Sequence, residues 1–123
     1  MSELIDKIKN IKEVDGWFTT GLNIKNEEID YIVNNIKTRE EIESLPSFLS
    51  KYMTKNQIDK LFSNEFSNYI KRDFVENIPQ NTVLSLDYKT FQKFTDIQAV
   101  ALGDINLYKL NKNDRLMELN NDA

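Results

Sequence analysis

The spacing of apolar residues along the chain changes at Pro79. Before Pro79, apolar residues recur three and four positions apart, which is the period of an amphipathic helix. After Pro79 they alternate with polar residues, as in Thr82-Val83-Leu84-Ser85-Leu86-Asp87-Tyr88, which is the period of a half-buried strand. The sequence therefore predicts an α+β fold, in which an N-terminal helical bundle over residues 1–78 is followed by a small C-terminal β-strand-rich subdomain over residues 81–123.

Two capping motifs mark helix starts in the first part. Thr38-Arg39-Glu40-Glu41 and Thr54-Lys55-Asn56-Gln57 match the capping box, in which the first and fourth residues bond each other's backbone amide groups. The second motif opens a wide aromatic stripe, so we expect one long helix over residues 57–74. The stripe consists of Ile58, Leu61, Phe62, Phe66, Tyr69, Ile70 and Phe74. Such a stripe is typical of the central helix of a bundle, and the seam of an oligomer is the alternative.

Turn residues divide the second part into short strands. Gly103-Asp104 predicts one turn, and Asn111-Lys112-Asn113-Asp114 predicts a hairpin loop between strands at 105–110 and 116–119. About four or five short strands in so few residues favour a small, strongly bent sheet. Because such a tail is too short to build a large core, we expect it to be a semi-independent appendage.

Trp17 is the single tryptophan of the chain and lies between Gly16 and Gly21. The two glycines predict a loop. A large aromatic side chain in a loop either anchors a partner protein or folds back over the end of its own core. Folding back is the more common outcome, and the sequence leaves both open.

The composition excludes most of the common kinds of catalytic site. The 123 residues include no histidine and no cysteine, so the usual general base, thiol nucleophile and soft metal ligands are missing. Three glycines are too few for a loop that cradles phosphate. Paired acids such as Glu27-Glu28 suit the first turn of a helix, and a carboxylate-only site for a hard metal stays open as an alternative. We therefore expect a protein that is not an enzyme, with no catalytic residue, no cofactor and no metal.

Charge and hydropathy narrow the choice of partners. The 16 basic and 20 acidic side chains give a net charge of −4, and the basic residues are scattered. We therefore expect no strong direct binding to nucleic acid, which requires a local basic excess. No apolar run approaches the roughly 18 residues of a membrane span, and the first residues are too charged for a signal peptide. We expect a cytoplasmic protein whose partners are proteins.

Three stretches resemble the subunits of GINS, the replisome scaffold of archaea and eukaryotes, in the branch whose helical domain comes first. Leu45-Pro46-Ser47-Phe48-Leu49 is similar to a Leu-Pro that precedes a helix in that family, and residues 57–74 look like its long interface helix. The order of Val83-Leu84, Val100-Ala101-Leu102-Gly103-Asp104 and the 107–114 hairpin follows its β domain. The chain departs from the family at Asn120, where the family has proline.

The resemblance implies a non-enzymatic scaffold subunit for DNA replication, in a tetramer that bridges the MCM helicase ring and a RecJ-like partner. The alternative is a virus- or plasmid-encoded inhibitor, of the anti-CRISPR kind, that binds and blocks a host nucleic-acid-processing enzyme. The acidic balance suits such mimicry, although the acids are interleaved with lysines. Either function predicts an oligomer or a subunit of a larger complex. The expected contact residues are Phe62, Phe66 and Tyr69 on the long helix and Leu107, Tyr108 and Leu110 on the C-terminal hairpin.

Overall fold

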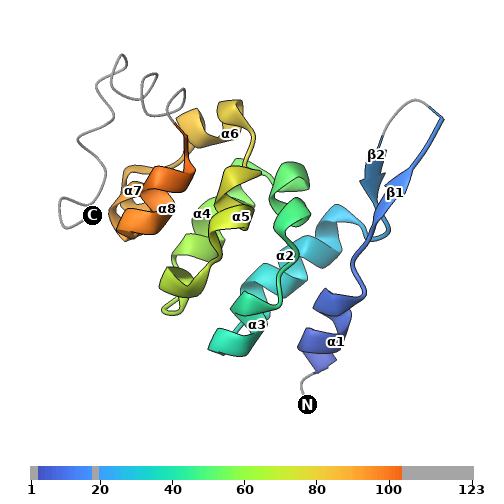
Figure 1. The fold of residues 1–123 in the computed structure, drawn as a ribbon. Coiled ribbons are helices and arrows are strands. Elements are labelled where there is room, and N and C mark those ends of the chain that lie inside the picture. The colour runs from blue at the N-terminus through green and yellow to red at the C-terminus, as the bar shows by residue number, and fades with distance from the viewer. Residues whose placement is uncertain (1–2, 18–19, 104–123) are drawn as a thin grey trace.

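Short helices form most of residues 3–17 and 20–103, which are the residues that the computed structural model describes. They lie in a row that runs from α1 at one end to α7 and α8 at the other (Figure 1). The α-helices are α1 (Glu3–Lys9), α2 (Asn26–Asn35), α3 (Arg39–Glu43), α4 (Lys55–Phe62), α5 (Arg72–Glu76), α6 (Gln80–Ser85), α7 (Tyr88–Lys93) and α8 (Asp96–Ala101). The 3-10 helices are η1 (Ser47–Tyr52) and η2 (Ser67–Tyr69). The strands β1 (Glu13–Asp15) and β2 (Thr20–Leu22) pair antiparallel.

The predicted strand-rich C-terminal subdomain is wrong, because residues 80–101 form the helices α6, α7 and α8. Val83 and Leu86 are both fully buried, and their spacing of three residues is that of one helix face. A run of six residues satisfies this spacing as readily as it satisfies alternation, so the period alone could not choose between helix and strand. The predicted hairpin at 105–119 lies outside the described residues.

The expected long helix over residues 57–74 is broken into α4, η2 and α5. The break lies at Ser63 and Asn64, whose side chains bond to backbone groups. Ser63 Oγ donates to the Lys60 carbonyl oxygen at 2.6 Å, and Asn64 Oδ1 accepts from the Phe66 amide at 2.8 Å. Asn64 Nδ2 also donates to the carbonyl oxygen of Ile36 at 2.9 Å. Such bonds compete with the hydrogen bonds of a continuing helix, so the chain turns here.

Seven of the helical elements begin in two series with a spacing of eight residues, whereas η2, whose N-cap residue is Phe66, does not follow this spacing. Their N-cap residues are at positions 38, 46 and 54, and then at 71, 79, 87 and 95. The first three positions of the second series repeat the first series 33 positions later, so that Pro46 and Pro79 occupy matching places. We call residues 38–70 the first unit and residues 71–103 the second unit. The two units are copies of one structural plan.

Matching positions of the two units make matching contacts. Ser44 Oγ donates to the Glu40 carbonyl oxygen at 2.7 Å, and Asn77 Nδ2, 33 positions later, donates to the Asp73 carbonyl oxygen at 3.1 Å. The first element of each unit packs against the last, α3 against η2 and α5 against α8. Five equivalent pairs are buried in both units: Ile42 and Val75, Leu45 and Ile78, Met53 and Leu86, Ile58 and Phe91, Leu61 and Phe94. The chain is therefore a short stack of repeats, in which neighbouring units stabilise each other.

The hydrophobic core continues across Pro79. One cluster of buried residues extends from Leu4 in α1 to Leu102 after α8. Phe62 of the first unit stacks on Phe94 of the second, with ring centroids 4.5 Å apart and planes 15° apart. Pro79, which marked the predicted boundary between the helical part and the tail, is the N-cap residue of α6. The second unit is thus packed on the first through shared core residues.

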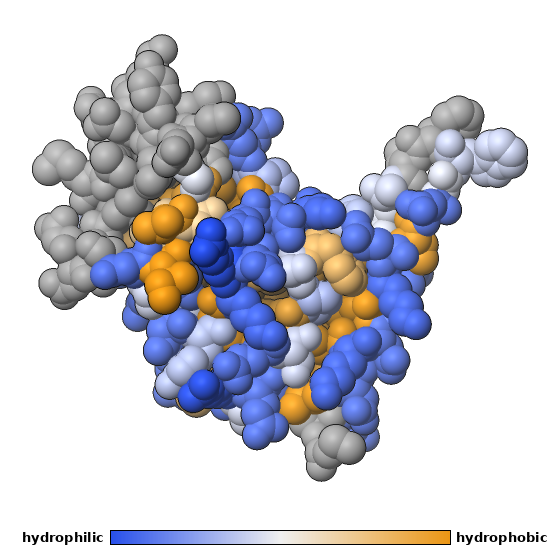
Figure 2. Space-filling view, in the orientation of Figure 1, coloured by the Kyte–Doolittle hydropathy of each residue, from blue (hydrophilic) through white to orange (hydrophobic). Residues whose placement is uncertain are grey.

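The β1–β2 hairpin stands away from this core. It projects from the α1 and α2 end of the row, and Figure 2 shows it as an arm that is separate from the body of the molecule. Its register pairs Glu13 with Leu22, Val14 with Gly21, and Asp15 with Thr20. Within the described residues, this hairpin is the whole β content of the fold.

Candidate interaction surfaces

The base of the hairpin is fixed by polar contacts. The Tyr52 hydroxyl donates to Glu13 Oε2 at 2.6 Å, and Lys51 Nζ lies 3.6 Å from the same oxygen. Below the strands, Asn23 Oδ1 accepts from the Lys12 amide at 2.9 Å, and Asn23 Nδ2 donates to the Asn10 carbonyl oxygen at 2.9 Å. These bonds hold the start of the arm against η1 and α1, so the tip is presented in a defined direction.

Near the tip, apolar side chains face solvent. The Trp17 side chain is 96% exposed and Val14 is 46% exposed. Trp17 therefore does not fold back over the core, which was the more common of the two outcomes expected from the sequence. Gly21 lies opposite Val14, and a Cβ added to it would meet no atom within 4 Å. The fold itself does not require glycine at that position, because neither packing nor a positive φ excludes a side chain there.

A second apolar surface lies at the other end of the row. Ile97 and Val100 are three residues apart on α8, and they are 66% and 67% exposed. Together with Arg72 of α5 and Asp96 they line a shallow groove of about 200 Å³. Figure 2 shows apolar surface at this end of the molecule. We call this feature the α8 groove.

The residues expected to contact partners differ in their burial. Phe62 is fully buried against Phe94, so it contributes to the core. Phe66 and Tyr69 are half-buried, and the Arg39 guanidinium lies 4.2 Å from the centre of the Tyr69 ring. Phe62 ends α4, Phe66 is the N-cap residue of η2, and Tyr69 ends η2, so the three do not lie on one helix face. Leu107, Tyr108 and Leu110 lie outside the described residues.

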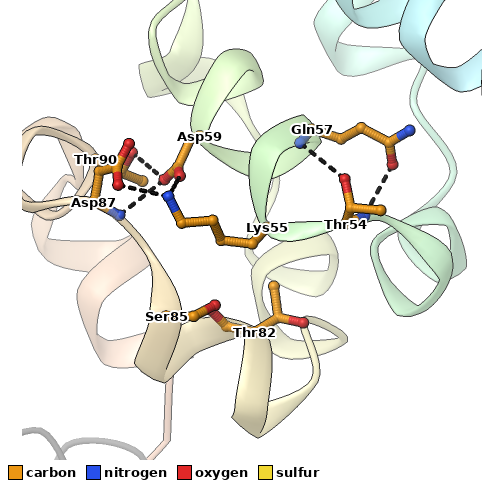
Figure 3. A network of polar contacts seen from close by, with 8 residues as sticks. All are labelled: Thr54, Lys55, Gln57, Asp59, Thr82, Ser85, Asp87 and Thr90. Atoms are coloured by element: carbon orange, nitrogen blue, oxygen red, sulfur yellow. Dashed lines mark hydrogen bonds and ion pairs between the residues drawn. The ribbon is translucent and has the colours of Figure 1, made fainter.

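A polar network joins α4 of the first unit to the start of α7 in the second (Figure 3). Lys55 Nζ lies 2.7 Å from Asp59 Oδ2 and 2.5 Å from Asp87 Oδ1. Asp59 Oδ1 accepts from Thr90 Oγ1 at 2.6 Å and from the Asp87 amide at 3.0 Å. The hydrogen bonds to Asp59 and then Asp87 raise the pKa of Lys55 above its ordinary value, against a smaller opposing effect of desolvation.

This network performs a structural task rather than a chemical one. A lysine whose pKa is raised stays protonated near neutral pH, so its amine is no nucleophile there. Both carboxylates are engaged by Lys55, and they are therefore poorly placed to act as general bases. A hollow of about 210 Å³ lies beside the network, between Ser63, Lys89 and Lys93. Among the residues that the structure describes, no cluster of three or more His, Cys, Asp or Glu could hold a metal ion.

The buried polar side chains are also structural. The two predicted capping boxes are confirmed: Thr38 and Thr54 accept from the amides of Glu41 and Gln57, both at 3.2 Å. A third box, which was not predicted from the sequence, begins at Thr95. Its fourth residue, Gln98, is 1% exposed and donates to the carbonyl oxygens of Ser67 at 2.8 Å and Ile70 at 3.0 Å.

The sequence contained one signal for the start of α8, the helix that carries the α8 groove. Thr95-Asp96-Ile97-Gln98 matches the capping box pattern, which marks a helix start. A helix that begins there places Ile97 and Val100 on one face. The sequence alone favours burial of these two large apolar side chains, so their exposure of 66% and 67% is a finding of the structure.

Comparison of the chain with protein-family models, with curated proteins and with solved structures finds no match. The GINS resemblance, the contact residues and the absence of catalysis therefore stay predictions. Within residues 3–17 and 20–103, no helix is long and apolar enough to span a membrane.

Proposed function

We propose that the protein is a non-enzymatic interaction module that binds another protein through the tip of its hairpin. The observation that carries this proposal is the 96% exposure of Trp17 on an arm whose base is fixed. Tryptophan is among the residues that most often dominate the energy of protein interfaces. An exposed indole adds nothing to the core, so its presence at a fixed tip is explained by contact with a partner.

The rest of the described surface supports binding rather than catalysis. The residues with the strongest mutual interactions, Lys55, Asp59 and Asp87, connect the two units. The buried amides of Gln57 and Gln98 satisfy backbone and side-chain acceptors inside the stack. Stacks of helical repeats commonly serve as binding scaffolds, because their extended surfaces present contacts far apart on one rigid body.

The partner decides between the two finer functions that the sequence suggests. A replication scaffold should bind helicase or nuclease components of a replisome, whereas an inhibitor should bind one host nucleic-acid-processing enzyme. The strand order from Val83 to Leu102, on which part of the GINS resemblance rested, is replaced by helices. The Leu45-Pro46 feature persists, since Pro46 is the N-cap residue of η1.

Affinity capture with matched variants tests the proposal. The full chain and its Trp17→Ser and Tyr31→Ser variants are used as baits in extract from the source organism. Tyr31 is an exposed aromatic of α2, at 54%, and serves as the control. A protein captured by the wild type and by Tyr31→Ser, but lost with Trp17→Ser, supports the proposal. Identical captures by all three baits would refute it. The captured protein then separates scaffold from inhibitor.

A further inference from the structure

The α8 groove leaves two apolar side chains in water at the end of the described part of the chain. Ile97 and Val100 are 66% and 67% exposed, although a helix normally turns such residues inward. Stacks of repeats generally need an end element that covers the last apolar face. The chain continues beyond Gly103 to Ala123, over residues 104–123, which lie outside the described residues.

We propose that residues 104–112 turn back along α8 and fill the α8 groove, so that the chain covers its own exposed end. Leu107 and Leu110 supply the apolar contact. The inference goes beyond the proposed function and is independent of it, because Trp17 takes no part. Three observations support it: the backbone turn at Gly103, the spacing of buried residues along the stack, and the charges at the groove.

Gly103 follows α8 and provides the turn that this return requires. Its φ is +85°, in the left-handed region that glycine adopts without strain, and its amide donates to the Val100 carbonyl oxygen at 3.1 Å. A left-handed glycine directly after a helix ends the helix and redirects the chain. Val100 and Ile97 lie three and six positions before Gly103, and Leu107 and Leu110 lie four and seven positions after it. A segment that returns antiparallel to α8 therefore brings Leu107 to Val100 and Leu110 to Ile97.

The spacing of buried residues continues past Gly103. In the second series, each N-cap residue is followed by buried apolar residues four and seven positions later. These pairs are Val75 and Ile78, Val83 and Leu86, Phe91 and Phe94, and Ala99 and Leu102. The next term of the series is position 103, for which the same offsets give Leu107 and Leu110. One step further they give Arg115 and Glu118, so the apolar pairs end with Leu110. We therefore expect Leu107 and Leu110 to be buried, and the α8 groove is an exposed apolar surface close to them along the chain.

The charges at the groove favour this segment. Arg72 is already paired with Glu76, at 2.8 Å between Nε and Oε1. Asp96 is therefore the groove charge that has no partner within the described residues. It lies at the start of α8, which is the end of the groove farthest from the point where the chain leaves the helix. A segment that returns along α8 carries Lys109 and Lys112 toward that end, where an ammonium group complements the carboxylate.

Covalent connection allows a small contact to persist. The groove has a volume of about 200 Å³, which is too small for a stable interface between separate proteins. A segment joined directly to α8 meets the groove at an effective concentration on the order of millimolar, so a weak contact is sufficient. Leu107 and Leu110 then serve inside the chain and are not the partner contacts predicted from the sequence. The Trp17 tip stays in water and remains available to a partner.

Thiol labelling of the full chain tests the inference. The protein contains no cysteine, so Val100→Cys places a single thiol in the groove, and Ile97→Cys is a second groove variant. Tyr31→Cys places a single thiol at an exposed control position on α2. Mass spectrometry follows the reaction of each thiol with a small maleimide. We expect the groove thiols to react about 10-fold more slowly than the control, as for a site that opens to solvent roughly one tenth of the time.

Substitutions in the segment identify what covers the thiol. Adding Leu107→Ser and Leu110→Ser to Val100→Cys should restore the rate of an exposed thiol. The matched control adds Leu116→Ser and Leu119→Ser, which have the same spacing but lie beyond the series, and it should leave the thiol protected. Protection should also be equal at about 1 μM and about 100 μM protein, because it arises within one chain. Circular dichroism confirms that each variant is folded.

A disulfide provides a second measurement. In the variant that combines Val100→Cys with Leu107→Cys, oxidised glutathione, which is itself reduced to two thiols, should join the two cysteines within one chain. The product has the mass of a monomer without two hydrogen atoms. Val100→Cys combined with Leu116→Cys is the matched pair and should react more slowly.

Groove thiols that react as fast as Tyr31→Cys would show an open groove and overturn the inference. Protection that persists after Leu107→Ser and Leu110→Ser, or that the control pair of substitutions removes equally, would overturn the assignment to these residues. Protection that rises with protein concentration would identify a second copy as the occupant, which also contradicts the inference. None of these results changes the capture experiment with Trp17→Ser, so the proposed function stands or fails separately.

Discussion

Replacing Phe94 with alanine tests whether the second unit is held to the first by a shared core. Phe94 and Phe62 are both fully buried, and their rings are stacked with centroids 4.5 Å apart. The two residues are separated by Pro79, where the sequence predicted a boundary between domains. A large effect of Phe94→Ala on the whole molecule would show that no such boundary divides the core.

The expected magnitude follows from the burial. Replacing a fully buried phenylalanine with alanine costs about 3–5 kcal/mol of folding free energy, because transfer from water and packing are both lost. Domains of this size have a total stability of roughly 5–15 kcal/mol. The substitution should therefore remove a large fraction of the stability of the entire chain. A double-mutant cycle that combines Phe94→Ala with Phe62→Ala should give a coupling energy of about 0.5–1.5 kcal/mol between the two rings, the range measured for aromatic pairs.

Urea unfolding followed by circular dichroism measures this effect. The helical signal reports on both units, whereas the emission of the exposed Trp17 does not. At a slope of roughly 2 kcal/mol per M, a loss of 4 kcal/mol lowers the midpoint by about 2 M. The control is Tyr88→Ala at the start of α7, the helix that Phe94 follows; the Tyr88 side chain is 56% exposed, and the expected change is within about 0.5 kcal/mol.

Two results would refute the reasoning. If Phe94→Ala cost no more than Tyr88→Ala, α7 would not be packed on α4 as the structure shows. If Phe94→Ala produced two separate transitions, with part of the helical signal retained, the two segments would fold independently, as the sequence first suggested.

Four further predictions concern other parts of the stack. A fragment of residues 1–79 should be largely unfolded by circular dichroism, because it leaves Phe62 and the rest of the α4 face uncovered; a cooperative melt of this fragment would contradict the shared core. Gln98→Leu should cost about 1–3 kcal/mol in urea unfolding, since it leaves two buried carbonyl oxygens without donors. The raised pKa of Lys55 means that its charge stabilises the fold fully below the ordinary value of 10.5 and that this contribution is lost at higher pH. Thermal melts of the wild type and Lys55→Met should therefore differ at neutral pH and converge in strongly alkaline solution. Trp17→Ser should leave the melting temperature unchanged, because the indole is 96% exposed.

Helix starts were predictable where side chains and backbone satisfy each other locally. Thr38 and Thr54 both cap helices as the sequence indicated, because a capping box involves residues only three positions apart. The continuation of a helix was less predictable. Asn64 ends the predicted long helix partly by donating to Ile36, a residue 28 positions away, which no local pattern reveals.

The prediction of a strand-rich tail was wrong for a related reason. Short runs such as Val83 to Leu86 carry too few residues to distinguish a period of two from a period of 3.6. Their burial depends on the first unit, because α6 packs against α4. The exposure of Trp17 was likewise undecided by sequence, because it depends on the direction of the hairpin arm, which Tyr52 fixes from η1.

The 33-residue unit has a consequence for how such a chain can change in length. Inserting one further unit between residues 70 and 71 would present each new face to an equivalent neighbour, since both units bury matching positions. The insertion would leave the Trp17 tip and the α8 groove chemically intact and move them apart by the thickness of one unit. An insertion of a few residues inside a unit would instead shift its caps out of the eight-residue spacing. Duplication of a unit would therefore change the distance between the two end surfaces by one unit thickness at a time.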